Sequence, residues 1–302
     1  MKKILLCILV FFAAGYFVVM ETETGQDLFL DRLLSVMTQN QQTAPVDGLD
    51  VYICGASSPL STTGNAQSCV FIIAGDRSFV VDTGPGSPRV IRRLGLPLNN
   101  LEAVLLTHFH GDHISALGDV NFNSWVAGRG KKLTVMGPEG VDLVVNGFNQ
   151  AYSLDSSYRT RHHGWDILPL EYSVMQSKTI EAGLVFEEDG LSIRAFRVDH
   201  SPIEPAVGYR FDYKGRSVAV SGDSIVTEDY REAVDSVDLL LADALSEVLV
   251  SKMSEALSAN GNERTSKLIH DVLDYHASTT SLVEMAKQAK VRQLAFYHMV
   301  PM

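Results

Sequence analysis

The sequence predicts a layered α/β fold whose strands end in potential metal ligands. Four segments share one pattern, an apolar or alternating strand-like run that ends in histidine or aspartate. They are 101–113, 195–200, 217–223 and 293–298. Apolar residues at helical spacing fill most of the remaining C-terminal part. This mixture of elements predicts packed layers of helices and strands.

The first twenty residues are expected to form a separate N-terminal element. Lys2 and Lys3 precede an apolar run from Ile4 to Met20 without a polar face. This pattern favours an uncleaved membrane anchor, with a cleaved secretory signal as the alternative. Because the lysines lie on the N-terminal side, the body is expected to be exported, in a periplasmic or other extracytoplasmic location.

Residues 21–45 are expected to be a polar linker with one short helix over 27–37, and a catalytic body is expected over 46–302. The 302 residues are 46% hydrophobic, which is enough to bury a large core in one layered domain.

The body begins with strands and ends mainly in helices. Strands are predicted over 49–54, 68–74, 78–82, 101–106, 132–136, 191–199, 208–213 and 216–221. Helices are predicted near Val90 and over 227–234, 247–259, 265–275 and 280–289. Residues 213–216 match a hairpin turn between two of these strands.

Two cysteines, Cys54 and Cys69, lie on neighbouring predicted strands and could face each other. Export would permit a disulfide between them. Two buried free thiols are the favoured interpretation, because free cysteine behaves as a small apolar residue in protein cores.

The densest chemical signal is the segment Thr107–His113, which places His108, His110, Asp112 and His113 within six positions. Imidazole nitrogen and carboxylate oxygen are ligands of zinc-type ions. A solvated histidine-rich loop would need neither this ligand density nor the apolar strand before it. The segment therefore predicts a metal site at the end of a buried strand.

Several motifs of the chain resemble those of the metallo-β-lactamase-fold hydrolases, and within them those of the ribonuclease Z-like branch. Residues 107–113 match the His-x-His-x-Asp-His signature in full. The segment 275–279 resembles the His-Ser-Thr element of that branch, and 54–60 resembles its Gly-x-Gly-Ser-Pro opening with Ser57 in place of the second glycine. The segments 80–84 and 136–140 also fit. The resemblance covers about residues 46–302 and implies an αββα sandwich, two mixed β-sheets flanked by helices.

The resemblance also implies the remaining metal ligands, His200, Asp223 and His298. One divalent ion would take His108, His110 and His200, a second would take Asp112, His113 and His298, and Asp223 would bridge them. A hydroxide formed from water between two such ions would be the nucleophile. Zinc is the expected metal, with manganese or iron as alternatives.

Asp112, His276 and Asp243 are the candidate catalytic residues. In the resembled branch, the histidine at the position of His276 contacts the scissile phosphate and helps to protonate the leaving group. Asp243 occupies the position of a glutamate that orients this histidine. Because aspartate is shorter, the hydrogen bond to His276 is expected to be long, which would weaken proton transfer.

Two intervals bear on the substrate. The insertion between Gly140 and His200 contains the aromatic and basic stretch 158–165. The spacing from His113 to His200 leaves room for a helical cover over the metal site, which we expect there. His162 and His163 in it are expected to line a pocket or the surface, since the ligand set is already complete. The interval from His200 to Asp223 has no room for the long arm with which tRNA-processing members grip tRNA.

These observations favour a binuclear hydrolase of small phosphodiester or aryl sulfate-type substrates, with residual ribonuclease activity. The net charge of −11 makes a nucleic-acid partner possible but not favoured. A β-lactamase is the alternative, and Arg159 or Arg161 near the site would support it. A lactonase or thioesterase, or a non-catalytic binding module, is less favoured. The expected partners are a small-molecule substrate, the membrane through the N-terminal anchor, and a second copy in a homo-oligomer.

Overall fold

The computed structural model describes residues 12, 15–37, 47–60 and 64–301. The chain divides into two compact units, residues 1–43 and 44–302. The first unit contains helix α2, Glu23–Met37, which includes the helix predicted over 27–37. Residues 1–11, 13 and 14 of the expected anchor lie outside the described residues. Among the residues that are described, no helix has both the length and the apolar character needed to cross a membrane.

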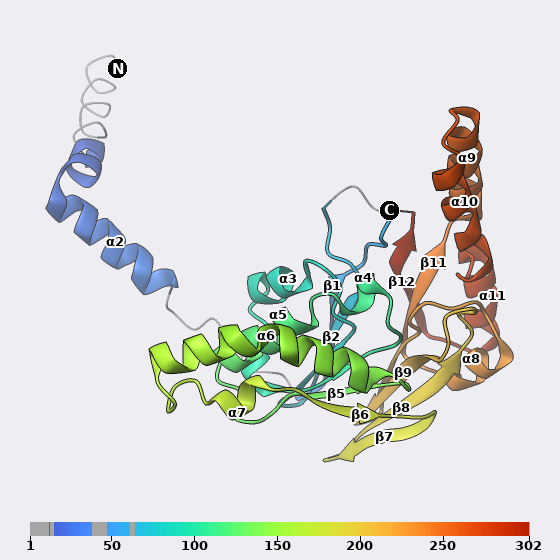
Figure 1. Cartoon of the computed structure of the whole chain (residues 1–302), viewed down its shortest axis with the longest axis horizontal. Coiled ribbons are helices and arrows are strands. Elements are labelled where there is room, and N and C mark those ends of the chain that lie inside the picture. The colour runs from blue at the N-terminus through green and yellow to red at the C-terminus, as the bar shows by residue number, and fades with distance from the viewer. Residues whose placement is uncertain (1–11, 13–14, 38–46, 61–63, 302) are drawn as a thin grey trace, which may run out of the picture. The chain divides into compact units, whose positions relative to one another are not determined.

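The second unit contains two six-stranded sheets that face each other (Figure 1). The first sheet has the strand order β1-β2-β3-β4-β5-β6 and consists of β1 Leu49–Gly55, β2 Cys69–Ala74, β3 Arg77–Val81, β4 Leu101–Leu105, β5 Thr134–Gly137 and β6 Gln176–Thr179. The second has the order β12-β11-β10-β9-β8-β7 and consists of β7 Gly183–Glu188, β8 Leu191–Val198, β9 Ala206–Tyr213, β10 Arg216–Val220, β11 Leu239–Leu245 and β12 Gln293–Val300.

Both sheets are mixed. In the first, β1, β2 and β3 pair antiparallel, and β3 to β6 run parallel. In the second, β10, β11 and β12 run parallel, and β7 to β10 pair antiparallel. The hairpin predicted at 213–216 joins β9 to β10.

Helices cover the outer faces of the sheets. Those that follow the first sheet's strands are α3 Ser87–Arg93, η1 Leu98–Asn100, α4 Gly111–Ile114, α5 Leu117–Val126, α6 Val141–His163 and α7 Leu170–Ser173. In the second half, α8 Glu228–Ala233 and α11 Thr279–Gln288 pack on the outer face, whereas α9 Glu247–Ala259, α10 Glu263–Asp271 and η2 Val272–Asp274 lie beyond the strand ends (Figure 1). The expected αββα sandwich is therefore confirmed.

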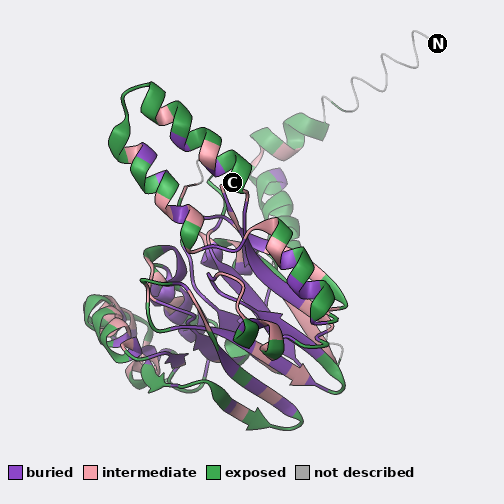
Figure 2. Ribbon diagram, turned by 90° about the vertical axis from the view of Figure 1, so that its right-hand side faces the viewer, coloured by how far each residue is buried: buried purple, intermediate pink, exposed green. Residues whose placement is uncertain are grey.

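Three apolar cores hold the four layers together, and the buried strands between them are evident in Figure 2. Phe79 and Phe211 meet between the sheets with ring centroids 5.9 Å apart. Ile91 of α3 packs with residues of α5 and α6 on the outer face of the first sheet. Tyr230 of α8 and Leu282 of α11 pack on the outer face of the second. Burial of this apolar surface is the main stabilising contribution to the fold.

Cys54 and Cys69 form a disulfide, so the expectation of two free thiols is wrong. Ile53 pairs with Val70 and Gly55 pairs with Cys69, which leaves Cys54 as the extra residue of a β-bulge. The bulge changes the direction of the Cys54 side chain relative to simple alternation along the strand. Alternation along the sequence does not predict such a change, and both cysteines are fully buried.

The turn after β3 depends on glycine at position 84. A Cβ atom at Gly84 would lie 2.3 Å from the carbonyl oxygen of Asp112 and 2.5 Å from the carbonyl carbon of Gln67. Both contacts are with backbone, which cannot move aside as a flexible side chain would. We expect Gly84→Ala to lower the free energy of unfolding by roughly 3 kcal/mol, the upper part of the range for overpacking.

Gly147→Ala in helix α6 is the matched control, because a Cβ there would have no neighbour within 4 Å. We expect it to be neutral or to stabilise the helix by roughly 0.5–1 kcal/mol. Urea denaturation of both variants measures the difference. Equal stabilities of the two variants would contradict the tight packing at Gly84.

Candidate metal centre

The candidate ligands meet where the C-terminal ends of strands from both sheets come together. His108 and His110 follow β4, and Asp112 and His113 belong to the short helix α4. From the second sheet, the structure brings in His200 after β8, Asp223 after β10, Asp243 in β11 and His298 in β12. Each side is rigid because a sheet strand positions its ligands.

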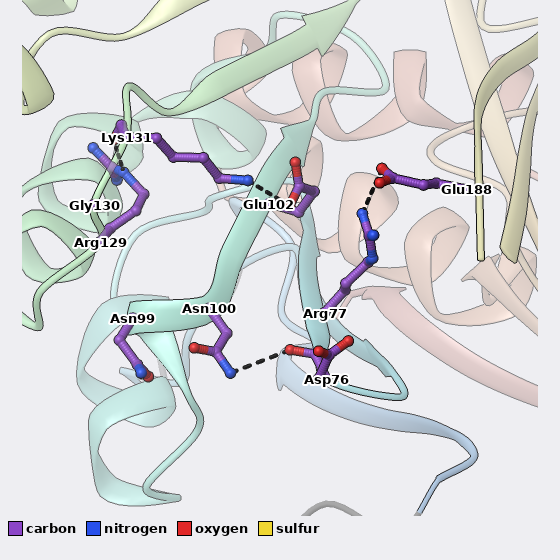
Figure 3. Close-up of a pocket in the computed structure, with 9 residues that line it drawn as sticks. All are labelled: Asp76, Arg77, Asn99, Asn100, Glu102, Arg129, Gly130, Lys131 and Glu188. Atoms are coloured by element: carbon purple, nitrogen blue, oxygen red, sulfur yellow. Dashed lines mark hydrogen bonds and ion pairs between the residues drawn. The ribbon is translucent and has the colours of Figure 1, made fainter.

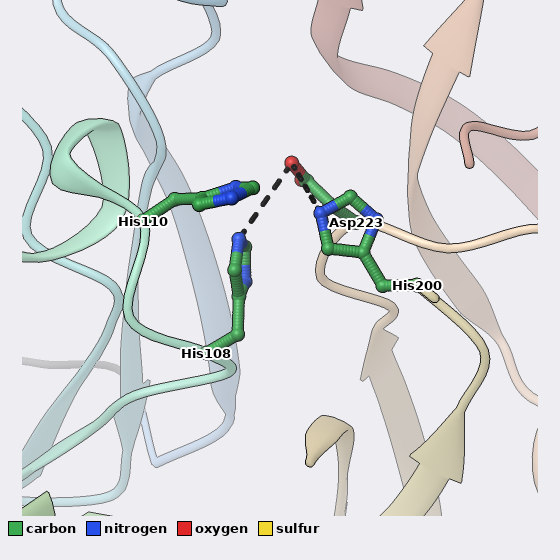
Figure 4. Close-up of side chains that lie close together, drawn as sticks. All are labelled: His108, His110, His200 and Asp223. Atoms are coloured by element: carbon green, nitrogen blue, oxygen red, sulfur yellow. Dashed lines mark ion pairs between the residues drawn. The ribbon is translucent and has the colours of Figure 1, made fainter. Parts of the chain in front are cut away.

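One group of ligand atoms comprises His108, His110, His200 and Asp223, all within 4.8 Å of one another (Figure 4). The Oδ2 atom of Asp223 lies 3.9 Å from Nε2 of His108 and 4.0 Å from Nε2 of His200. These distances leave room between the atoms for an ion that contacts each of them at about 2.0–2.2 Å.

A second group comprises Asp112, His113, Asp223 and His298, also within 4.8 Å. Oδ2 of Asp223 is 3.3 Å from Nε2 of His113, and Oδ2 of Asp112 is 2.9 Å from Nε2 of His298. Asp223 belongs to both groups, so its carboxylate lies where a bridging ligand would be needed. The structure thus brings together all seven residues that the sequence indicated as ligands.

The ligand atoms fit a metal because protein groups do not satisfy them. Nε2 of His108, His113 and His200 is buried and has no hydrogen-bond partner among the described residues. Buried polar atoms are ordinarily paired, since an unpaired one costs free energy. Three imidazole nitrogens aimed at one carboxylate are therefore best explained by a cation between them.

The electrostatics of the two groups differ. Burial lowers the pKa of His108 and His110, and lowers the pKa of His200 to about 4. These imidazoles are therefore neutral, the form that binds a metal. Burial also opposes protonation of His113, but the charges of Asp223 and Asp82 outweigh it and raise the pKa of His113. The second group thus favours a positive charge, which a divalent ion supplies better than a proton.

Asp82 orients the ligands and was not among the residues predicted from sequence. Its Oδ2 atom is 2.8 Å from Nδ1 of His113 and accepts a hydrogen bond of 2.8 Å from the hydroxyl of Thr107. That hydroxyl lies 3.1 Å from Nδ1 of His108. One carboxylate therefore holds one histidine of each group, which directs the Nε2 atoms towards the site. The feature of the sequence that could have identified Asp82 is its position at the end of a predicted strand.

The candidate dyad is also formed. Nδ1 of His276 lies 2.8 Å from Oδ2 of Asp243, so the expectation of a long hydrogen bond is wrong. The His276 ring is 5.3 Å from that of His200 and 5.6 Å from that of His298, measured between centroids. Burial opposes its protonation, but the hydrogen bond to Asp243 and the charge of Asp223 outweigh burial and raise the pKa of His276.

The insertion between Gly140 and His200 does not cover the site as expected. Its longest element is helix α6, which packs on the outer face of the first sheet with α5 and α7 (Figure 1). Its last turn carries the exposed His162 and His163. Arg159 pairs with Asp155 at 2.8 Å. Helix α6 has 23 residues and is therefore about 34 Å long.

A separate polar pocket of ≈ 550 Å³ lies at the opposite edge of the first sheet (Figure 3). It is lined by residues at the start of β3, β4 and β5 rather than at their ends. Arg77 pairs with Glu188 at 2.6 Å, and Lys131 pairs with Glu102 at 2.5 Å. Because Arg77 and Lys131 are paired with carboxylates within the pocket, these two cations offer little attraction for an anionic ligand.

Comparison with known proteins agrees with this geometry. Residues 77–299 match the family model described as beta-lactamase superfamily domain. The chain is 30% identical to ribonuclease Z of Mycobacterium bovis over 256 residues, which cover 84% of this chain and 86% of the relative. It is 32% identical to ribonuclease Z of Mycolicibacterium gilvum over 256 residues, with coverages of 84% and 85%.

Solved structures share the fold. Human tRNase Z, short form, has a TM-score of 0.60 at 17% identity, with coverage of 82% of this chain and 92% of that one. The metallo-beta-lactamase fold protein YhfI from Bacillus subtilis has a TM-score of 0.59 at 17% identity, with coverages of 85% and 88%. The fold and the paired histidine–aspartate groups define a metal-dependent hydrolase of the metallo-β-lactamase fold. More narrowly, the chain belongs to the ribonuclease Z family of the beta-lactamase superfamily.

The comparison corrects the expected location. The matched relatives are ribonucleases Z along 84% of the chain, which contradicts an exported protein held by an N-terminal membrane anchor. That expectation depended on the apolar run from Ile4 to Met20 after two lysines. Hydropathy and flanking charge describe a segment that can enter a membrane, but they do not establish that it does.

The role of Asp82 can be tested by replacing its charge. Asp82→Asn keeps the shape of the side chain but removes the carboxylate that fixes His113. We expect metal affinity to fall about 10- to 100-fold, the usual effect of losing an outer hydrogen-bond partner. Competition with a chromogenic chelator measures this affinity.

Asp238→Asn is the control, because Asp238 accepts a hydrogen bond of 3.0 Å from the backbone of Ser217 at the far end of the second sheet. It should bind metal as the native chain does. Native affinity in Asp82→Asn would show that Asp82 does not orient the ligands.

Proposed function

We propose that the chain is a binuclear metal-dependent phosphodiesterase in which His108, His110 and His200 hold one ion and Asp112, His113 and His298 hold another, with Asp223 shared. The observation that supports this most is the hydrogen-bonded His276–Asp243 dyad beside two groups of unpaired buried ligands. When bound, two divalent ions would lower the pKa of an attacking water and stabilise charge on the phosphoryl oxygens. Zinc is the ion proposed from the ligand types, with manganese as the alternative.

His276 is the proposed proton donor. Its Nδ1 atom donates a hydrogen bond to the carboxylate of Asp243, which fixes the ring and leaves Nε2 for the substrate. As the bond between phosphorus and the leaving oxygen breaks, the proton on Nε2 passes to that oxygen. Asp243 acts as a positioning residue, because it stabilises the charged ring without contacting the substrate.

RNA is the substrate class that the relatives support, since those that match along most of the chain are named ribonuclease Z. A small phosphodiester is the second candidate. The specific observation in its favour is the short connection from His200 to Asp223, which contains only the β9–β10 hairpin and its flanking turns. The net charge of −11 also weakens attraction to a nucleic-acid backbone.

The β-lactamase alternative has less support. It needs a cation at the site for the carboxylate of a β-lactam. Arg159 pairs with Asp155 and lies over the ring of Phe122, and Arg161 lies over the ring of Tyr158. The side-chain contacts of both guanidinium groups are therefore formed within the α5–α6 region.

A leaving-group comparison tests the role of His276. An RNA linkage releases an alkoxide, which needs a proton, whereas bis(p-nitrophenyl) phosphate releases a weakly basic phenolate. We expect His276→Ala to lower kcat/KM for RNA by about 100- to 10,000-fold, with a much smaller loss for the aryl ester. His270→Ala, an exposed histidine of α10, should leave both unchanged.

An equal loss on both substrates would contradict proton donation by His276. A chromogenic β-lactam belongs in the same assay. Turnover of the β-lactam that exceeds phosphodiester turnover and survives His276→Ala would refute the proposed function and favour the lactamase.

Substrate size can be tested separately with the native chain. If RNA is the substrate, kcat/KM for a single-stranded oligoribonucleotide should exceed that for the small aryl diester. It should also fall as salt is raised, because phosphate contacts release counterions. Faster turnover of the small diester with little salt dependence would favour the second candidate.

A further inference from the structure

Three buried ligand atoms beside the metal centre form no hydrogen bond among the described residues. Oδ2 of Asp223 faces His108, His113 and His200, whereas Oδ1 of the same carboxylate has no hydrogen-bond partner among the described residues. Nε2 of His298 contacts Asp112, whereas its Nδ1 forms no hydrogen bond among the described residues. Oδ2 of Asp243 contacts His276, whereas its Oδ1 is unpaired.

These atoms belong to residues that lie together. Four buried residues each offer a ligand atom within 4.8 Å of the others, and they are Asp223, Asp243, His276 and His298. Nδ1 of His298 is 3.3 Å from Oδ1 of Asp223. Unpaired oxygen and nitrogen atoms in one buried volume require a partner, because each left unsatisfied costs free energy.

We propose that Asp223, Asp243, His276 and His298 form a third divalent-cation site beside the two catalytic ions. Two aspartates and two histidines are a ligand set suited to zinc or manganese. The third ion can share Asp223 with the second ion through the other carboxylate oxygen. It can share His298 through Nδ1 when that imidazole releases its remaining ring proton to solvent and bridges the two ions as an imidazolate. A third group made of the same atoms as the second would instead have excluded simultaneous binding.

The charge of the site predicts that the third ion binds more weakly than the others. The three groups together contain only three carboxylates, those of Asp112, Asp223 and Asp243. Two divalent ions already exceed this negative charge. A third must therefore enter against a net positive potential at short range.

The third ion would alter the dyad. An ion held by His276 through Nδ1 replaces the hydrogen bond between that atom and Asp243, and the neutral imidazole then keeps its one proton on Nε2. The ring can no longer become the doubly protonated form that gives up a proton readily. If the proposed function holds, filling the third site should therefore inhibit hydrolysis at high metal concentration.

Metal stoichiometry tests the site without relying on turnover. The full chain is stripped of metal and dialysed to equilibrium against increasing Mn²⁺ alone, with bound ions counted by elemental analysis and free Mn²⁺ by electron paramagnetic resonance. The native chain should bind two ions and then a third with lower affinity. Asp243→Asn and His276→Ala should keep the first two, because neither residue belongs to the first two groups, and should weaken the third at least about tenfold.

His270→Ala is the matched control and should bind three ions as the native chain does. Saturation of the native chain at two ions up to millimolar Mn²⁺ would overturn the proposal, and would leave the unpaired atoms to buried water. A third ion that persists in both variants would overturn it too, as adventitious binding elsewhere. A chain that binds a third ion but cleaves no phosphodiester when only the first two sites are filled would reject the proposed function alone.

Discussion

The site depends on one shared carboxylate, that of Asp223, which is buried between two sheets with a relative exposure of 2%. Its two oxygens face different histidines, so each sheet must deliver its ligands to the same small volume. Close approach is possible because Gly222 precedes it. A Cβ at that position would lie 2.8 Å from Cβ of Thr107, and the φ of Gly222, +68°, is unfavourable for other residues. The ends of β4 and β10 therefore meet only because position 222 has no side chain.

Asp82 adds a second constraint, because it makes the orientation of the two ligand groups interdependent. It contacts His113 directly and His108 through Thr107, and it also accepts the backbone N–H of Thr107 at 2.9 Å. A ligand of the first group therefore cannot rotate without disturbing the hydrogen bonds that fix one of the second. Metal affinity in such a site depends on residues that never contact the ion.

The sequence predicts best those parts of the fold and the site in which a strand-like run of residues leads directly into a potential metal ligand. The segment from His108 to His113 and the strands ending near His200, Asp223 and His298 were predictable because apolar or alternating runs lead directly into candidate ligands. Strand β6 could not be predicted from the sequence. Its residues, Gln176–Thr179, are all polar and exposed, so polar and apolar side chains do not alternate along it. His298 illustrates the same limit at one residue. It is the extra residue of a bulge in β12 with φ of 46°, and only the paired strand reveals that geometry.

The His276–Asp243 dyad shows that the separation of two residues in the sequence does not predict how close their side chains lie in the site. His276 and Asp243 are 33 positions apart, and helices α9 and α10 occupy most of that interval as a hairpin beyond the strand ends (Figure 1). The base of the hairpin is closed by backbone hydrogen bonds, from Leu245 to the carbonyl of Ala277 at 2.8 Å and from Ser246 to that of Val300 at 2.9 Å. Because these bonds fix both ends, the hairpin can differ in length or surface without moving the dyad. Selection among phosphodiesters can therefore evolve in the hairpin and the other connections, while the buried ligands and their hydrogen bonds stay as they are.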